Sequence, residues 1–220
     1  MKNDLPQLLP LMINMEHKKV VIFGGGQVGE RKASLFVKYA PTTLISRSFT
    51  SRIHDLEKQG LELIRVNTLS DNEILDYING AFIVIPATSD RKLNKKIANL
   101  AHSNRCLVNS VDGLDDLAVP SIIKRGNITL AISTQGASPA LSKFIRLKIE
   151  ETIPDNAEFE DMVRLLKEMR EILKTKVTNQ KDRASILWDI LEDEEVWKAL
   201  GESYEVAFDV ARKHMEQNPR

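Results

Sequence analysis

The chain has little cysteine, no excess of charge of either sign and no long apolar run. Its 220 residues include one cysteine, Cys106, which excludes an intramolecular disulfide and fits a reducing cytosol. The 31 basic and 31 acidic side chains cancel, which argues against a general nucleic-acid binder, because such proteins usually carry a basic excess. No segment approaches the roughly 18 apolar residues that a membrane span needs. These absences favour a cytoplasmic protein.

Metal-ligand spacing and a targeting signal are also missing. The four histidines are far apart in the sequence, so we expect no metal site among them: His17, His54, His102 and His214. The short apolar stretch Leu8 to Ile13 is broken by Pro10. It lacks the basic flank and the small-residue cleavage site of a signal peptide. We expect it to pack on a sheet as an N-terminal arm.

A glycine-rich turn is the most informative feature that is present. Gly24, Gly26 and Gly29 have the G-x-G-x-x-G spacing, directly after the apolar run Val20 to Phe23. In a strand-turn-helix unit, the first glycine permits the turn, the second admits a pyrophosphate and the third lets the helix pack closely. The helix start at Gln27 and Val28 offers free N–H groups to phosphates. The pattern predicts dinucleotide binding.

Strand and helix signals then alternate as far as residue 111. Strands are expected at 20–23, 42–46, 61–66, 81–85 and 106–111, and helices at 27–39, 51–59 and 90–103, with a further helix that opens at 70–73. Ser70 and Glu73 form a capping-box pattern at the start of the third helix. Alternating β and α units predict an α/β fold with a parallel, doubly wound sheet, whose ligands bind at the carboxyl ends of the strands.

The pattern changes after Asp112. Two strands joined at Arg125-Gly126 predict a hairpin, and a helix from Ser138 to about Thr152 follows it. From Asn156 onward, apolar residues at three- and four-residue intervals predict helices only. We therefore expect a Rossmann-like domain at 1–113, a small αβ dimerisation element at 114–152 and a helical C-terminal domain at 153–220. The middle element is too short for its own core, so a homodimer is expected.

Several motifs together resemble one family. The segments that carry the resemblance are Gly24 to Ala33, Pro86 to Asp90, Val108 to Asp112, Pro120 to Gly126 and Gly136 to Ser142. They are similar, in order, to segments of the precorrin-2 dehydrogenases, some of which are also sirohydrochlorin ferrochelatases, within the siroheme synthases. The helical tail is similar only in size and character.

The resemblance implies an activity and a catalytic residue. The chain would oxidise precorrin-2 to sirohydrochlorin with NAD⁺, in siroheme biosynthesis, and it would bind no nucleic acid and no membrane. Asp112 follows the fifth predicted strand, at the edge where a Rossmann domain presents the nicotinamide. The resemblance favours Asp112 as the base, although Asp112-Gly113 is also a good turn pair. Whether the chain inserts iron as well is left open.

A polar loop is the expected substrate contact. Precorrin-2 carries many carboxylates, and the loop of Ser133, Thr134, Gly136 and Ser138 precedes a helix, so it offers hydroxyl and N–H donors. Lys124 of the hairpin adds a cation. Ser138-Pro139 is also a simple N-cap and first-turn proline pair, and the two roles do not exclude each other.

The sequence departs from the usual pattern at the position that binds the ribose of the cofactor. The acid expected about 20 residues after the glycines is missing, and Ser46 and Arg47 stand there instead. By themselves they suggest a 2′-phosphate and NADP, whereas the resemblance favours NAD, which we choose. Thr88 is expected to line the same cleft.

Two other function classes remain open. A glutamyl-tRNA-reductase-like enzyme needs a catalytic thiol in a domain before the glycine motif, where this sequence has only a short segment. A non-enzymatic nucleotide-sensing regulatory subunit would bind a nucleotide but would leave the Gly136 to Ser138 loop unexplained.

Overall fold

The chain forms two compact units. The computed structural model describes residues 8–111, 115–152 and 157–217. By internal contacts, one unit is made of residues 1–119 with 135–138, and the other of 120–134 with 139–220. The predicted boundaries at 113 and 152 fall in or beside segments outside the described residues, so the three-part division stays a prediction.

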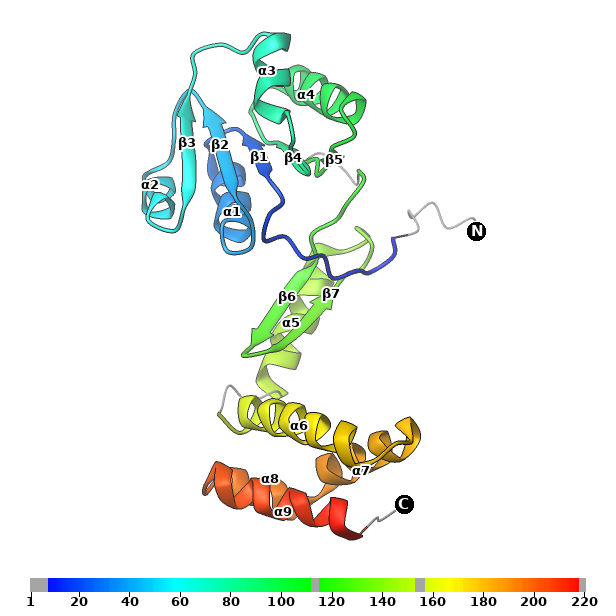
Figure 1. Cartoon of the computed structure of the whole chain (residues 1–220). Helices are drawn as coiled ribbons and strands as arrows, with labels where there is room; N and C mark the ends of the chain where they lie inside the picture. Colours follow the sequence, from blue (N-terminus) through cyan, green and yellow to red (C-terminus); the bar gives the residue numbers. More distant parts are fainter. Residues whose placement is uncertain (1–7, 112–114, 153–156, 218–220) are drawn as a thin grey trace, which may run out of the picture. The chain divides into compact units, whose positions relative to one another are not determined.

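The first unit is built on a parallel sheet of five strands (Figure 1). The strand order is β3-β2-β1-β4-β5, and all pairs are parallel, as predicted. The strands are β1 (Val20–Phe23), β2 (Thr42–Ser46), β3 (Leu61–Arg65), β4 (Ile83–Pro86) and β5 (Leu107–Val108). The helices are α1 (Gln27–Phe36), α2 (Ser51–Glu57), α3 (Asp71–Ile78) and α4 (Arg91–Ser103).

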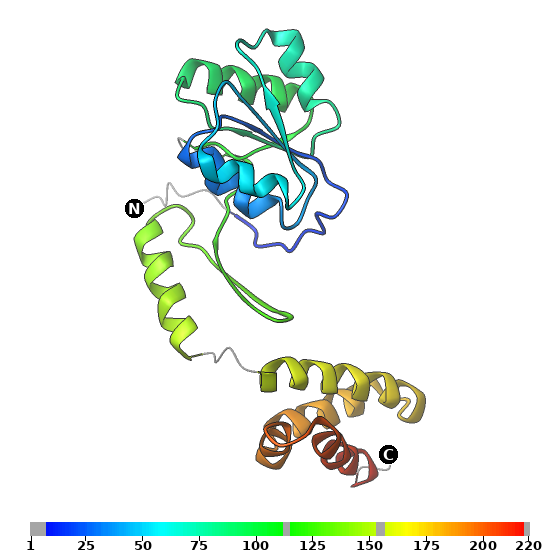
Figure 2. The same ribbon diagram turned by 90° about the vertical axis from the view of Figure 1, so that its left-hand side faces the viewer.

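Helices cover both faces of this sheet (Figures 1 and 2). Alternate residues of β1 point to opposite faces. Val20 and Ile22 pack in one core with residues of α1 and α2, and Val21 and Phe23 pack in a second core with residues of α3 and α4. Burial on both faces explains why β1 and β4 are continuously apolar.

The fifth strand is shorter than predicted, and Pro86 explains why. The predicted strand ran from residue 106 to 111, but β5 contains only Leu107 and Val108. The amide of Asn109 still donates to the carbonyl of Val84. The next bond in this register needs the N–H of residue 86, which proline lacks. The strand ladder therefore stops there, at the carboxyl edge of the sheet.

The expected packing of the N-terminal arm on the sheet is wrong. Leu9, Leu11 and Met12 are 69–77% exposed, and only Met15 packs against the sheet's core. The reason is that helices already occupy both faces of the sheet, which leaves no apolar face for the arm.

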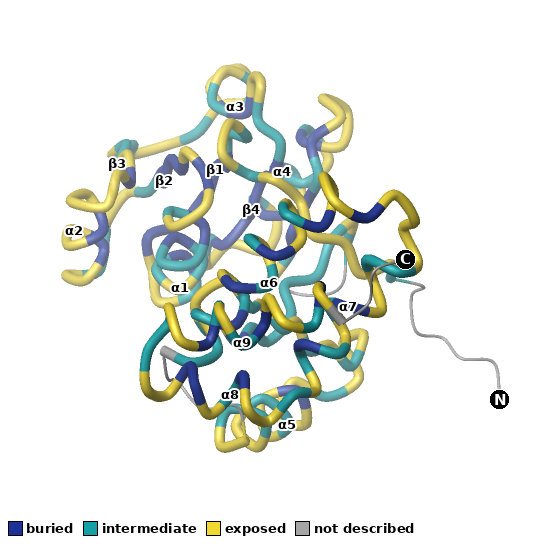
Figure 3. The backbone as a smooth tube through the Cα atoms, turned by 60° about the horizontal axis from the view of Figure 1, so that its bottom comes forward, coloured by how far each residue is buried: buried dark blue, intermediate teal, exposed yellow. Residues whose placement is uncertain are grey.

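In the second unit, an antiparallel hairpin is followed by a long helix, as predicted. The hairpin consists of β6 (Ser121–Arg125) and β7 (Ile128–Ile132), and α5 spans Pro139–Thr152. Most of α5 is coloured as exposed or half-buried in Figure 3. Its exposed apolar side chains include Leu141, Phe144 and Leu147.

The rest of the second unit is helical. It contains α6 (Ala157–Lys176), α7 (Gln180–Glu192), α8 (Glu194–Leu200) and α9 (Tyr204–Gln217). Their core includes Met162, Met169 and Leu173 of the predicted stripe, together with Leu165. Among the residues that the structure describes, no helix has the length and apolar character of a membrane span.

Candidate functional site

The glycine turn has the geometry that dinucleotide binding requires. Gly24 has a φ of +117°, and a Cβ there would overlap the carbonyl of Ala87. A Cβ on Gly29 would overlap the carbonyl of Gly24, so α1 packs directly on the turn. A Cβ on Gly26 would meet no atom within 4 Å. Gly26 therefore faces open space, and the packing of the fold does not require a glycine there.

The start of α1 is held in place without a side-chain cap. Gly26 is the N-cap residue and has no side chain to offer, so the N–H groups of Gln27, Val28 and Gly29 stay available for an anion. The Ser46 hydroxyl accepts a hydrogen bond from the Gly25 amide at 2.9 Å, which joins β2 to the turn. The adjacent Arg47 is exposed. These positions suit the cofactor roles predicted for Gln27, Val28, Ser46 and Arg47, which stay predictions.

The loop after β4 is fixed by a residue that the sequence did not single out. Asn94 of α4 is 7% exposed. Its side-chain oxygen accepts from the Thr88 amide at 2.9 Å and from the Thr88 hydroxyl at 2.7 Å, and its amide donates to the Thr88 carbonyl. Three bonds to one buried amide hold the Thr88 loop rigidly beside the glycine turn. The cofactor role predicted for Thr88 itself remains untested.

Hydrogen bonds connect the end of β5 to residues 115–117, which follow it in the chain. The Val108 amide donates to Asp116 at 2.8 Å, and the Ser110 hydroxyl donates to Asp115 at 2.6 Å. The Asn109 side chain donates to the Leu117 carbonyl at 3.0 Å. These three bonds join residues 108–110 to residues 115–117. The predicted base, Asp112, lies outside the described residues.

Lys32 of α1 reaches the same loop. Its Nζ donates to the side-chain oxygen of Asn109, and burial, followed by the nearby charge of Arg31, lowers the pKa of Lys32. Asn109 thus links α1 to Leu117. Lys32 and Asn109 both lie in segments that carry the family resemblance. Their position in these segments could have identified them as candidate site residues from the sequence.

The structure also gathers three titratable side chains that are separated in the sequence. His102 of α4 lies 3.0 Å from Asp116 and 3.6 Å from Asp115, measured between its Nε2 and carboxylate oxygens. The ligand atoms of the three all lie within 4.8 Å of one another. The sequence analysis did not predict this group, because His102 lies more than ten residues from the two aspartates along the chain. Both carboxylates also accept hydrogen bonds from the β5 segment, so the group helps to hold the loop on α4.

The predicted substrate residues are divided between the two units. Gly136 and Ser138 belong with the sheet, whereas Lys124, Ser133 and Thr134 belong to the hairpin unit. Gly136 has a φ of +86°, and α5 begins directly after Ser138, as predicted. The Thr134 hydroxyl lies 3.2 Å from that of Ser142 on α5. The structure confirms the helix start, and the substrate roles stay predictions.

Comparisons with known proteins agree with this geometry. Residues 11–121 match the family model described as "Putative NAD(P)-binding". The sheet order, the glycine turn and this match together define a Rossmann-like domain that binds a nicotinamide cofactor. The open space at Gly26 and the uncapped start of α1 fit the pyrophosphate of such a cofactor.

Proteins of similar sequence show which family of nicotinamide-binding proteins the chain belongs to. A precorrin-2 dehydrogenase of Methanosarcina barkeri is 46% identical over 202 residues, which cover 90% of this chain and 89% of that protein. The chain belongs to the precorrin-2 dehydrogenase family. A siroheme synthase of Vesicomyosocius okutanii is 32% identical over 80% of this chain, but the match covers only 37% of that longer protein.

A solved structure supports the fold. SirC, a precorrin-2 dehydrogenase, superimposes with a TM-score of 0.68 at 23% identity, and the match covers 96% of this chain and 98% of SirC. This likeness extends over both units and confirms the α/β fold class.

Proposed function

We propose that this chain catalyses the NAD⁺-dependent oxidation of precorrin-2 to sirohydrochlorin in the cytoplasm. One observation carries the proposal: a dinucleotide-type glycine turn in a chain that is 46% identical, over 90% of its length, to a precorrin-2 dehydrogenase. The reaction removes a hydride and a proton from the substrate. The site must therefore hold a hydride acceptor and give the proton a path to a base.

The residues at the carboxyl edge of β1, β2 and β4 would hold the cofactor. Gly26 and the first amides of α1 would hold the pyrophosphate, and Ser46 and Thr88 lie on either side of the turn. A bound NAD⁺ supplies the hydride acceptor. We choose NAD⁺ over NADP⁺ because the family resemblance outweighs Arg47, whose side chain alone would suit a 2′-phosphate. An NADP⁺ affinity well above that for NAD⁺ would reverse this choice.

Asp112 is our proposed general base. Its support is the family resemblance, together with the described residues on either side of it, Asn109, Ser110, Asp115 and Asp116, which are held by hydrogen bonds after β5. The proton that accompanies hydride loss would pass to this carboxylate. Ser133, Thr134, Gly136, Ser138 and Lys124 would donate hydrogen bonds or charge to the carboxylates of the substrate.

The decisive experiment combines the wild-type chain with precorrin-2 and NAD⁺ and follows the formation of NADH. Asp112→Asn keeps the size of the side chain but removes its charge. Because a positioned general base contributes about 10²–10⁴-fold, we expect kcat to fall by about that factor while NAD⁺ affinity stays nearly normal. Asp76→Asn, on the exposed side of α3, is the matched control.

Two results would change the proposal. A wild-type chain that binds NAD⁺ but oxidises no precorrin-2 would favour the nucleotide-sensing alternative. An Asp112→Asn variant with more than about a third of the wild-type rate would exclude general-base catalysis of this size. In the same assay, insertion of iron or cobalt into sirohydrochlorin above the uncatalysed rate would add the ferrochelatase activity. We expect a dehydrogenase alone.

We also propose a homodimer formed by residues 115–151. The observation in its favour is the exposed apolar side of α5, where Leu141, Phe144 and Leu147 are 43–58% exposed and recur at three-residue spacing. Sedimentation at micromolar concentration should give about twice the 24.9 kDa chain mass. Phe144→Asp should produce monomers, whereas Val206→Asp, at an exposed apolar position of α9, should not. A wild-type monomer with full activity would contradict the dimer.

A further inference from the structure

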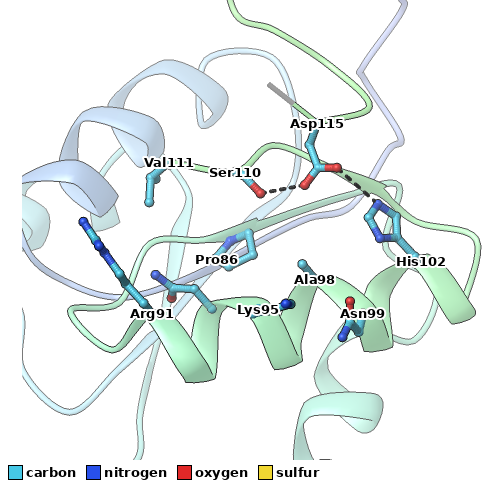
Figure 4. Close-up of a pocket in the computed structure, with 10 residues that line it drawn as sticks. Pro86, Arg91, Lys95, Ala98, Asn99, His102, Ser110, Val111 and Asp115 are labelled. Carbon is cyan, nitrogen blue, oxygen red and sulfur yellow. Dashed lines mark hydrogen bonds and ion pairs between the residues drawn. The ribbon is translucent and has the colours of Figure 1, made fainter. Parts of the chain in front are cut away.

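A pocket of about 400 Å³ lies at the carboxyl edge of the sheet, between α4 and the segment that follows β5 (Figure 4). This volume is in the range of small-ligand sites. Its lining comes from the end of β4, from one side of α4 and from the loop after β5: Pro86, Arg91, Asn94, Lys95, Ala98, Asn99, His102, Ser110, Val111 and Asp115. None of the cofactor or substrate residues predicted from the sequence lines it.

The pocket is a close neighbour of the glycine turn. Pro86 lines the pocket and pairs in register with Phe23, the last residue of β1. Gly24 follows Phe23 directly and is packed against Ala87. Adjacent strands are about 4.8 Å apart, so the pocket lies about one strand spacing from the turn, on the β4–β5 side. The pocket therefore adjoins the carboxyl-edge crevice in which a sheet of this kind binds a dinucleotide.

Two cations of the pocket have no ionic partner in the part of the chain that the structure describes. Arg91 and Lys95 are four residues apart and therefore lie on the same side of α4, and both are exposed. Neither makes a hydrogen bond or ion pair through its side chain with any residue in the described ranges. Lys96 of the same helix, by contrast, is paired with Asp71. The arginine and lysine side chains suit an anion from outside.

The acidic side chain of the pocket is already engaged. Asp115 accepts a hydrogen bond from Ser110 at 2.6 Å and lies 3.6 Å from His102, at the opposite end of the pocket from Arg91 (Figure 4). Between the two ends, Pro86, Ala98 and Val111 provide apolar surface, and Val111 is 36% exposed. The pocket thus combines an apolar middle with a cationic end.

We propose that this pocket binds the edge of the tetrapyrrole substrate, with Arg91 and Lys95 pairing with one or two of its peripheral carboxylates. The inference rests on the proposed function and adds a subsite to it. The pocket is too small for the whole macrocycle, so the rest of the ring would extend out of it over Val111. Arg91 and Lys95 would then hold the ring by its carboxylates and contribute to its affinity.

The test compares an Arg91→Gln/Lys95→Gln double variant with Lys92→Gln, a neighbouring exposed lysine of α4 that does not line the pocket. KM for precorrin-2 and the dissociation constant of sirohydrochlorin should rise about fivefold to tenfold in the double variant, as for the loss of two solvent-exposed ion pairs. Both constants should also depend less on salt concentration in the double variant than in wild type. kcat, NAD⁺ affinity and the Lys92→Gln variant should stay within about twofold of wild type.

Three results would overturn the inference, and they separate it from the proposed function. An unchanged KM and sirohydrochlorin affinity in an active double variant would exclude the subsite and leave the proposed function standing. A weaker NAD⁺ affinity with an unchanged KM would assign the two cations to the cofactor. A wild-type chain that cannot oxidise precorrin-2 would overturn the proposed function and the subsite together.

Discussion

The carboxyl edge of the sheet and the helical region of residues 157–217 are built by different rules. At the sheet edge, backbone geometry decides the residue: Gly24 and Gly29 stand where a Cβ would overlap a carbonyl. In the helical region, apolar side chains such as Leu165 and Met169 fill a core, and many substitutions of similar size would serve. The contrast teaches that a glycine at the sheet edge that packing does not require, such as Gly26, is a candidate for contact with a ligand.

The perturbed side chains of the two regions support this contrast. In the helical region, burial raises the pKa of Tyr204 to about 12, and the guanidinium of Arg164 lies 4.2 Å from the centre of its ring. These are packing contacts within one bundle. At the sheet edge, Lys32 and Asn94 instead fix loops that begin at the ends of strands. Such loops are where ligands of parallel sheets bind.

The sharpest way to test the contrast is to exchange two glycines of the same turn. Gly26→Val points a side chain into open space, so we expect NAD⁺ affinity to fall by more than about 100-fold, since the loss of one close backbone approach removes several hydrogen bonds. The circular dichroism spectrum should not change, and the melting temperature should fall only slightly, because valine is a poorer N-cap residue than glycine. Calorimetric titration and thermal unfolding measure the two properties.

Gly29→Val is the matched variant for this test. Its side chain would overlap the Gly24 carbonyl, so the cost falls on folding, and we expect a large loss of melting temperature or no folded protein. If Gly26→Val bound NAD⁺ normally, the turn would not be the pyrophosphate site.

Truncation of the helical core should give the opposite result. Leu165 is fully buried in the core of α6–α9, and Leu165→Ala should cost about 2–5 kcal/mol of unfolding free energy. Because this core supplies no cofactor contact in our proposal, NAD⁺ affinity should stay unchanged. Urea titration measures the first effect and calorimetry the second. A matching loss of NAD⁺ affinity under folding conditions would mean that the regions are not independent.

The smallest expected effect concerns Asp193, which caps α8. Its side chain accepts from the Glu195 amide at 2.8 Å and from His214 at 2.7 Å. Burial opposes the charged form, but these hydrogen bonds outweigh it, and the pKa of Asp193 is lowered. Asp193→Ala should cost about 0.5–2 kcal/mol at neutral pH, as for other N-caps. Asp209→Ala, at an exposed position of α9, should cost little.

The sign of the pH dependence follows from this lowered pKa. The stabilisation by Asp193 is fully present above the unfolded-state pKa of about 3.9 and is lost as the pH falls through the folded-state value. Urea titrations at pH 7 and pH 3 should therefore show a smaller difference between wild type and Asp193→Ala at the lower pH. An equal difference at both pH values would contradict the carboxylate's role.

The sequence predicted most of the fold because its patterns are local. The glycine spacing, the capping box at Ser70 and the alternation of apolar runs each depend on neighbouring residues, and the structure confirms them. The features that the sequence did not predict depend on contacts between segments that are distant along the chain. The exposure of the arm at Leu9 follows from helices that already cover the sheet, and the grouping of His102 with Asp115 follows from where α4 lies.

The candidate site divides in the same way. The sequence indicated the glycine turn, because its residues are consecutive. Asn94 was missed, since its importance comes from Thr88, which lies in the loop before its helix. The pocket was missed because its two walls come from α4 and from the segment after β5. Apolar patterns do not predict where two such elements leave a space between them.

Pro86 shows how small a chemical difference can decide where a scaffold ends and a reactive surface begins. The paired register of β4 and β5 ends at Val84 and Val108, and the last bond between them is the one from the Asn109 amide. One absent amide hydrogen sets that border. Replacing Pro86 by valine would give β5 another rung to bind, and the border would move outward at the expense of the pocket. A single residue of β4 can thus shift the boundary between the framework and the ligand-binding surface of this protein.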